Sequence, residues 1–175
     1  MLLVALLGSK RDLLLAPLVR MLSSRGYRVA TLTQASKLRV PEELREAAEA
    51  GASIRMACSV DRVLISSNFP LKELNEMIKV ISSLAPIEPD AVVILGFDEA
   101  VASDSRVMKV IAASSSSEAN QIISRISQPI IGTYSARGDL ESGYSTPESL
   151  AEAVISEGMR RKLLQPSPGR ISSDG

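Results

Sequence analysis

The segment Leu2-Leu3-Val4-Ala5-Leu6-Leu7-Gly8-Ser9-Lys10-Arg11-Asp12 joins an unbroken apolar run to a short polar loop that starts with glycine. Such a run is typical of a strand that is covered on both faces of a sheet. The apolar positions that follow predict a helix that ends at Gly26. Pro17 lies within it, so we expect the helix to be kinked there or to begin nearer to Pro17. The chain therefore opens with a strand, a loop and a helix.

Strands and helices alternate along the rest of the chain. Ser115 and Glu118 form a capping-box pattern that predicts the start of one helix, and Thr146 with Pro147 predicts the start of the last. Strands are expected at 27–33, 91–95, 107–112 and 129–132, a hairpin at 53–58 and 61–66, and further helices at 42–50 and 71–84. This alternation predicts an α/β fold, a three-layer sandwich with a mostly parallel sheet.

The length of 175 residues suits one domain with a substantial core. Hydrophobic residues make up 45% of the chain and charged residues 23%, which argues against intrinsic disorder and against a small disulfide-rich protein. We expect a single α/β domain over residues 1–164. Residues 165–175 lack hydrophobic periodicity and are expected to form a disordered tail.

Residue types and sequence patterns that the chain lacks exclude several kinds of site and partner. The chain has no His, which excludes a serine triad with an imidazole base and a His-rich zinc site. The net charge is zero and aromatic residues are 3% of the chain, so a nucleic-acid partner is not expected. The single cysteine, Cys58, cannot form an intramolecular disulfide, and no apolar run is long enough to span a membrane. We expect a cytoplasmic protein without a membrane partner.

Two loops at the ends of predicted strands are candidate ligand sites. The loop Gly8-Ser9-Lys10-Arg11-Asp12 leads into a helix N-terminus and carries two cations, so it could bind a phosphate, although a plain turn with solvated cations also explains it. Gly96 and Asp98 begin the second loop, in which Asp98 and Glu99 could hold Mg²⁺ through water or act only as helix-dipole partners. The long segment 132–145 is a third candidate, as a lid or binding loop.

The order of these elements, and short phrases within them, resemble the molybdopterin-guanine dinucleotide biosynthesis protein B family. Those proteins are small P-loop GTP-binding proteins that assist guanylylation of the molybdenum cofactor. The resemblance spans roughly residues 2 to 155. After the first strand, loop and helix, the phrases that carry it are Arg25–Val29, Glu46–Ala52, Asp90–Phe97 and Val107–Ser114.

The resemblance implies a P-loop NTPase-like fold, with GTP and Mg²⁺ as possible cofactors. Guanine nucleotide or molybdopterin, the cofactor-guanylylating enzyme and a second copy of the chain in a homodimer are the implied partners. It places the nucleotide-binding residues in the two loops described above, at Gly8, Ser9, Lys10, Arg11, Asp12, Gly96 and Asp98.

The chain departs from the family at the functional positions. The Walker A motif is degenerate: Lys10 or Arg11 stands where the phosphate-binding Lys is expected, and Asp12 occupies the region of the magnesium-binding Thr. Leu95 replaces an acidic residue, and Thr33–Lys37 replaces a His-rich stretch. Because hydrolysis needs Mg²⁺ held by a loop hydroxyl and a nearby acid, we expect at most a weak GTPase and no catalytic residue.

Three functional hypotheses remain open on the sequence. The first is a divergent nucleotide-binding adapter in molybdenum or tungsten cofactor biosynthesis, at the guanine dinucleotide step. The second is a pseudo-NTPase that binds a protein partner and no nucleotide. The third is a small-molecule-binding doubly wound domain of other ancestry, since a fold alone does not determine function.

Overall fold

The computed structural model describes residues 1–34, 41–58, 63–67, 73–84, 87–140 and 143–165. Its strands are β1 (Leu2–Leu7), β2 (Val29–Thr33), β3 (Ile54–Cys58), β4 (Val63–Ser67), β5 (Ala91–Leu95), β6 (Met108–Ala113) and β7 (Ile130–Ser135). Its helices are α1 (Asp12–Ser24), α2 (Glu42–Glu49), α3 (Leu74–Leu84), α4 (Asp98–Ala102), α5 (Ser116–Ile123) and α6 (Pro147–Arg160).

Five of the strands form one parallel sheet, in the order β2-β5-β1-β6-β7. The apolar run Leu2–Leu7 is its central strand and is buried along its whole length. Because strand side chains alternate between faces, Leu2, Val4 and Leu6 enter one half of the core and Leu3, Ala5 and Leu7 enter the other. The α/β class with a mostly parallel sheet is thus confirmed.

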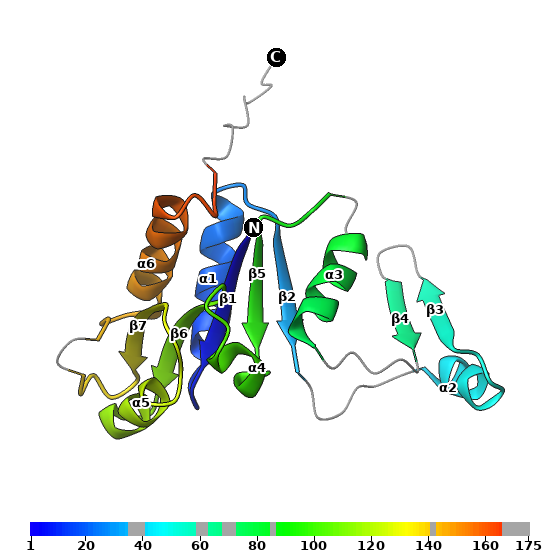
Figure 1. The fold of residues 1–175 in the computed structure, drawn as a ribbon, viewed down its shortest axis with the longest axis horizontal. Coiled ribbons are helices and arrows are strands. Elements are labelled where there is room, and N and C mark those ends of the chain that lie inside the picture. Colours follow the sequence, from blue (N-terminus) through cyan, green and yellow to red (C-terminus); the bar gives the residue numbers. More distant parts are fainter. Residues whose placement is uncertain (35–40, 59–62, 68–72, 85–86, 141–142, 166–175) are drawn as a thin grey trace, which may run out of the picture.

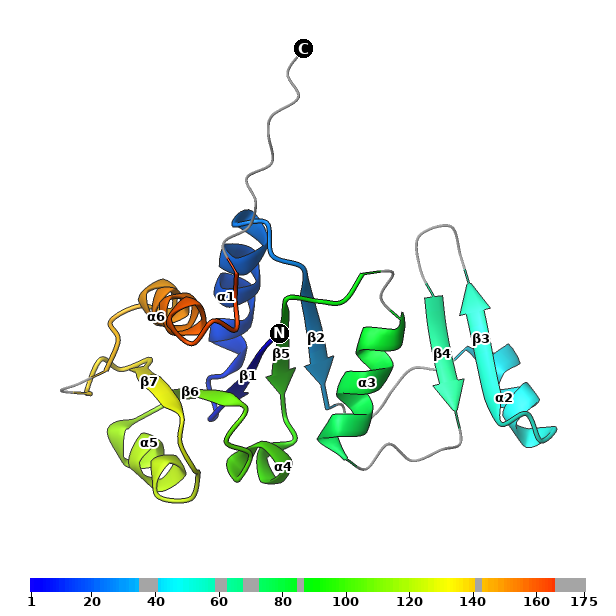
Figure 2. The same ribbon diagram turned by 45° about the horizontal axis from the view of Figure 1, so that its top comes forward.

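Helices cover both faces of this sheet (Figures 1 and 2). On one face, α1 and α6 pack against each other and against the sheet through Leu14, Leu18, Leu150 and Val154. On the other face, α3, α4 and α5 supply apolar side chains that include Leu74, Val101 and Ala119. Because β1, β5 and β6 are parallel neighbours, their carboxyl ends meet at one edge of the sheet. The loops at that edge lie between the two helical layers.

The elements differ from the sequence predictions in three places. Helix α1 begins at Asp12 and contains Pro17, so the alternative in which it begins nearer to Pro17 is wrong; the face that carries Leu14 and Leu18 packs against the sheet on both sides of the proline. For the short helix α4 the sequence analysis gives no range, only the helix start implied for Asp98 and Glu99, which both lie in its first turn. Strand β7 extends to Ser135, so the first four residues of the predicted loop 132–145 belong to the sheet, where they pair with β6.

Strands β3 and β4 form the expected antiparallel hairpin outside the main sheet. The predicted C-terminal tail lies outside the described residues from 166 onward. No helix in the described part of the chain is long and apolar enough to cross a membrane.

Candidate functional site

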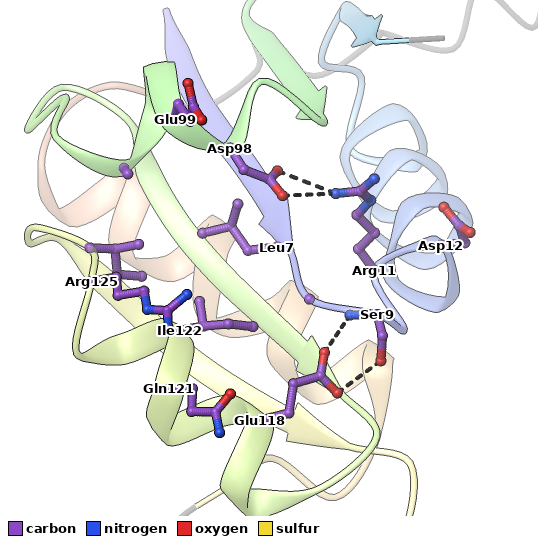
Figure 3. A pocket seen from close by; sticks show the side chains of 13 residues that line it. Leu7, Ser9, Arg11, Asp12, Asp98, Glu99, Glu118, Gln121, Ile122 and Arg125 are labelled. Atoms are coloured by element: carbon purple, nitrogen blue, oxygen red, sulfur yellow. Dashed lines mark hydrogen bonds and ion pairs between the residues drawn. The ribbon is translucent and has the colours of Figure 1, made fainter. Parts of the chain in front are cut away.

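A cleft of about 740 Å³ opens at the carboxyl edge of the sheet, between the loop after β1 and helices α4 and α5 (Figure 3). Its volume lies within the usual range of small-molecule sites. Its apolar wall comes from Leu7, Ala102, Ile122 and Ile126, and its polar and charged lining from Ser9, Arg11, Asp12, Asp98, Glu99, Glu118, Gln121 and Arg125, with Gly8 at the turn.

The loop after β1 is a tight turn fixed onto strand β6. Gly8 has a φ of +94°, and a Cβ there would lie 2.2 Å from the carbonyl oxygen of Ala112, so only glycine fits. That carbonyl accepts a hydrogen bond from the Lys10 N–H at 3.0 Å, and the Arg11 N–H donates to the Gly8 carbonyl at 3.3 Å. Two successive amides of the predicted phosphate loop therefore already have backbone partners.

The third amide of the loop is held by a carboxylate from helix α5. The Ser9 N–H donates to Oε1 of Glu118 at 2.7 Å, and the Ser9 hydroxyl donates to Oε2 at 2.8 Å (Figure 3). Oε2 also accepts from the N–H and the hydroxyl of Ser114, at 2.8 and 2.7 Å. These bonds, those from Ser114 first, lower the pKa of Glu118 to about 2 against the penalty of burial.

The predicted capping box forms only in part. The Ser115 hydroxyl accepts a hydrogen bond from the N–H of Glu118 at 3.3 Å, as expected. The carboxylate of Glu118, however, bonds to Ser114, one residue before the N-cap, and to Ser9, 109 positions away in the sequence. The Glu118 side chain thus ties the loop after β6 to the loop after β1.

Among the described residues, four carboxylates and two guanidinium groups line the cleft. Nη1 of Arg11 contacts both carboxylate oxygens of Asp98, at 3.2 and 3.3 Å. In Figure 3, Glu99 points away from this pair. Arg125 has no ion-pair partner among the residues that the structure describes. It is the cation of the cleft best placed to contact an anionic ligand.

A second, smaller hollow of about 440 Å³ adjoins the cleft beyond Arg11. Gly96 and Phe97 both have positive φ values, +80° and +58°, and they turn the chain sharply after β5. The side chain of Gln34 fills the space beside them, because its Oε1 accepts a hydrogen bond from the Phe97 N–H at 2.8 Å. A Cβ on Gly96 would lie 2.7 Å from Cβ of Gln34, which explains the glycine.

The structure brings most of the predicted site residues together. Gly8, Ser9, Arg11, Asp12 and Asp98 line the main cleft, while Gly96 lines the smaller hollow with Arg11 and Asp98. Lys10 is exposed and lines neither. Sequence reasoning missed Glu118 as a partner of the loop and also missed Gln121, Arg125 and Gln34. The polar stretch Ser114–Ser117 was the available signal.

No group of three or more acidic or cysteine side chains in the described residues could hold a metal ion. Mg²⁺ often needs only one or two carboxylates when the phosphates of a nucleotide supply other ligands. Of the two predicted carboxylates, Asp98 fits that limited role, because it lines the cleft at the start of α4, whereas Glu99 points away from it in Figure 3.

The parallel sheet, its strand order and the loop between β1 and α1 define a P-loop NTPase-like α/β fold. Within that class, the chain matches a crystal structure of molybdopterin-guanine biosynthesis protein B (MobB) with a TM-score of 0.67 and 15% sequence identity, over 89% of this chain and 99% of that one. The expected fold is thereby confirmed.

Two other MobB structures give similar values. The Bacillus subtilis protein has a TM-score of 0.62 at 15% identity, covering 94% of this chain and 99% of that one. A MobB homolog from Bacillus stearothermophilus has a TM-score of 0.58 at 14% identity, covering 93% and 98%. At these identities the likeness is one of fold. Neither protein-family models nor curated proteins give a match.

Proposed function

We propose that this protein is a divergent nucleotide-binding adapter in molybdenum or tungsten cofactor biosynthesis, acting at the guanine dinucleotide step. The observation that carries the proposal is the cleft at the carboxyl edge of β1, β5 and β6, in a fold shared with MobB over nearly the whole chain. In open α/β sheets, ligands bind at this edge. The ligand we propose is a guanine nucleotide or the related pterin.

The lining of the cleft suits a planar ring that carries an anionic group. Leu7 and Ile122 offer an apolar surface for the ring, and the amide of Gln121 can exchange hydrogen bonds with its polar edge. The guanidinium of Arg125 can contact the phosphate. Because carboxylates outnumber cations here, a nucleotide complexed with Mg²⁺ is favoured over the free anion.

The proposed role is that of a cytoplasmic, homodimeric adapter rather than an independent enzyme. In P-loop hydrolases a lysine reaches the terminal phosphates and a hydroxyl holds Mg²⁺. Here Lys10 lies outside the cleft lining, and the Ser9 hydroxyl donates to Glu118. We therefore propose weak or no GTPase activity, with the guanylylating enzyme of the pathway as the protein partner.

A second candidate is a pseudo-NTPase that binds a protein partner without nucleotide. The observation that favours it is the loop after β1, in which the N–H groups of Ser9, Lys10 and Arg11 are all engaged within the chain. A phosphate loop needs such groups free to point at the ligand. If the loop keeps these bonds, nucleotide affinity will be too low to measure.

Calorimetric titration with GTP, with and without Mg²⁺, separates the two candidates. The adapter proposal expects weak binding that strengthens when Mg²⁺ is present, and weaker binding of ATP, whose purine presents a different edge. The absence of any binding heat at millimolar GTP, with the fold verified by circular dichroism, would reject nucleotide binding and favour the pseudo-NTPase. The purified chain would then serve as bait for the guanylylating enzyme.

A further inference from the structure

The Glu118 carboxylate is bound in the way that a phosphate loop binds an anion. Its two oxygens receive four hydrogen bonds of 2.7–2.8 Å, two from the N–H groups and two from the hydroxyls of Ser9 and Ser114. Each donor lies just after a strand, β1 or β6, at the edge where ligands enter. Backbone N–H groups in such loops form the anion-binding hollow of phosphate sites.

All four donors to this carboxylate are neutral. Among the described residues, Glu118 forms no ion pair with Lys or Arg, since the Arg11 guanidinium is directed to Asp98 instead. The lowered pKa of Glu118 agrees with this geometry, because hydrogen bonds to the ionised form stabilise it. The Glu118 carboxylate is therefore an anion bound only by the neutral N–H and hydroxyl groups of Ser9 and Ser114, with no cation of the described chain paired to it.

We propose that the Glu118 carboxylate is an internal ligand of the loop between β1 and α1 and that it excludes phosphate from this loop. A phosphate that reached the Ser9 N–H would have to displace the carboxylate or lie against it, and two anions in contact repel each other strongly. The proposal rests on the proposed function only in taking the cleft as the ligand site. It makes Glu118 the residue that keeps nucleotide affinity low.

Phosphate affinity can be measured without a nucleobase by titrating the full chain with pyrophosphate. We compare the natural protein with Glu118→Ala and with a matched control, Glu99→Ala. Glu99 lines the same cleft and carries the same charge, but it has no bond to the loop. We expect Glu118→Ala to bind pyrophosphate at least tenfold more tightly than the natural protein, and Glu99→Ala to change affinity less than threefold.

Glu118→Gln provides a second variant in case the alanine substitution prevents folding. It keeps the side-chain length and one acceptor but removes the negative charge. We expect a gain in pyrophosphate affinity of at least threefold, together with an upfield shift of the Ser9 amide proton as its charged acceptor is lost. Circular dichroism and thermal unfolding verify the fold of each variant.

Two results would overturn the proposal. One is an equal gain in the Glu118 and Glu99 variants, which would reflect the general charge of the cleft. The other is no gain in folded Glu118 variants. These outcomes can be told apart from a failure of the proposed function. If the natural protein binds GTP but Glu118→Ala has no higher affinity for pyrophosphate, only the proposal about Glu118 is refuted. If Glu118→Ala binds pyrophosphate more tightly but the natural protein does not bind GTP, only the proposed nucleotide role is refuted.

Discussion

Replacing Glu118 by Gln is expected to destabilise the protein at neutral pH and to leave stability unchanged in strong acid. The substitution keeps the size of the side chain and removes the charge that Ser9 and Ser114 stabilise. The pKa of Glu118 falls from 4.5 to about 2 on folding. A shift of that size corresponds to about 3 kcal/mol at most. The side chain is partly exposed, so solvent screening reduces the expected loss to about 1–2 kcal/mol.

The pH dependence follows from the direction of the shift. A carboxyl group whose pKa is lower in the folded state contributes its full stabilisation above the unfolded pKa, and loses it as the pH falls through the folded pKa. For Glu118 this window runs from about pH 5 down to about 2. Urea denaturation of both proteins at several pH values should therefore show a difference of about 1–2 kcal/mol at pH 7 that shrinks steadily with acidification.

Glu157→Gln is a suitable control for the assay. The pKa of Glu157 is also lowered to about 2, but by the guanidinium groups of Arg160 and Arg161 on an exposed helix surface. Salt screens such pairs, so any effect of Glu157→Gln should fade in 1 M NaCl (Debye length about 3 Å), whereas the effect of Glu118→Gln should largely persist. A Glu118→Gln difference that is absent at pH 7, or equally large at pH 3, would refute the reasoning.

Three further substitutions test other parts of the structure. Gly8→Ala should lower the free energy of unfolding by about 2 kcal/mol or more in urea denaturation, because its Cβ would overlap the Ala112 carbonyl and its φ is positive; unchanged stability would be contrary to the described turn. Lys109→Met should remove the gain in stability that the natural protein shows as the pH rises toward the ordinary lysine range, because burial lowers the pKa of this lysine, whose Nζ donates to the Asp104 carbonyl at 2.7 Å. Urea denaturation at pH 7 and pH 10 checks this, and an equal gain in both proteins would contradict it. Arg125→Ala should weaken GTP binding about tenfold in calorimetry if this guanidinium contacts phosphate, and equal affinity would remove it from the site.

The central strands could be predicted from sequence because both of their faces are buried. Leu2–Leu7 and Ala91–Leu95 are apolar at every position, and the structure gives both strands the predicted bounds. Helix α4 has only five residues, too few to display a helical period. The segment that became the end of β7 contains Gly132 and polar side chains, so local composition favoured a loop where pairing with β6 determines the structure.

The candidate site could be predicted only where its residues are close in sequence. Gly8–Asp12 stands out as a loop between a buried strand and a helix, and Asp98 follows another buried strand. The partner of the loop is Glu118, whose own neighbours indicate nothing more than a helix cap. Its contact with Ser9 depends on β6 lying beside β1, an adjacency that a single sequence does not reveal.

Amide chemical-shift mapping of the full chain with Mg²⁺ and GTP tests the account most directly. Nucleotide binding in the cleft predicts shifts concentrated at Leu7, Ser9, Gln121 and Arg125, in loops and a helix that are far apart in the sequence and meet at one edge of the sheet. The hairpin of β3 and β4 should be unaffected. Shifts confined to other surfaces, or none at saturating GTP, would contradict the proposal that this cleft is a guanine nucleotide site.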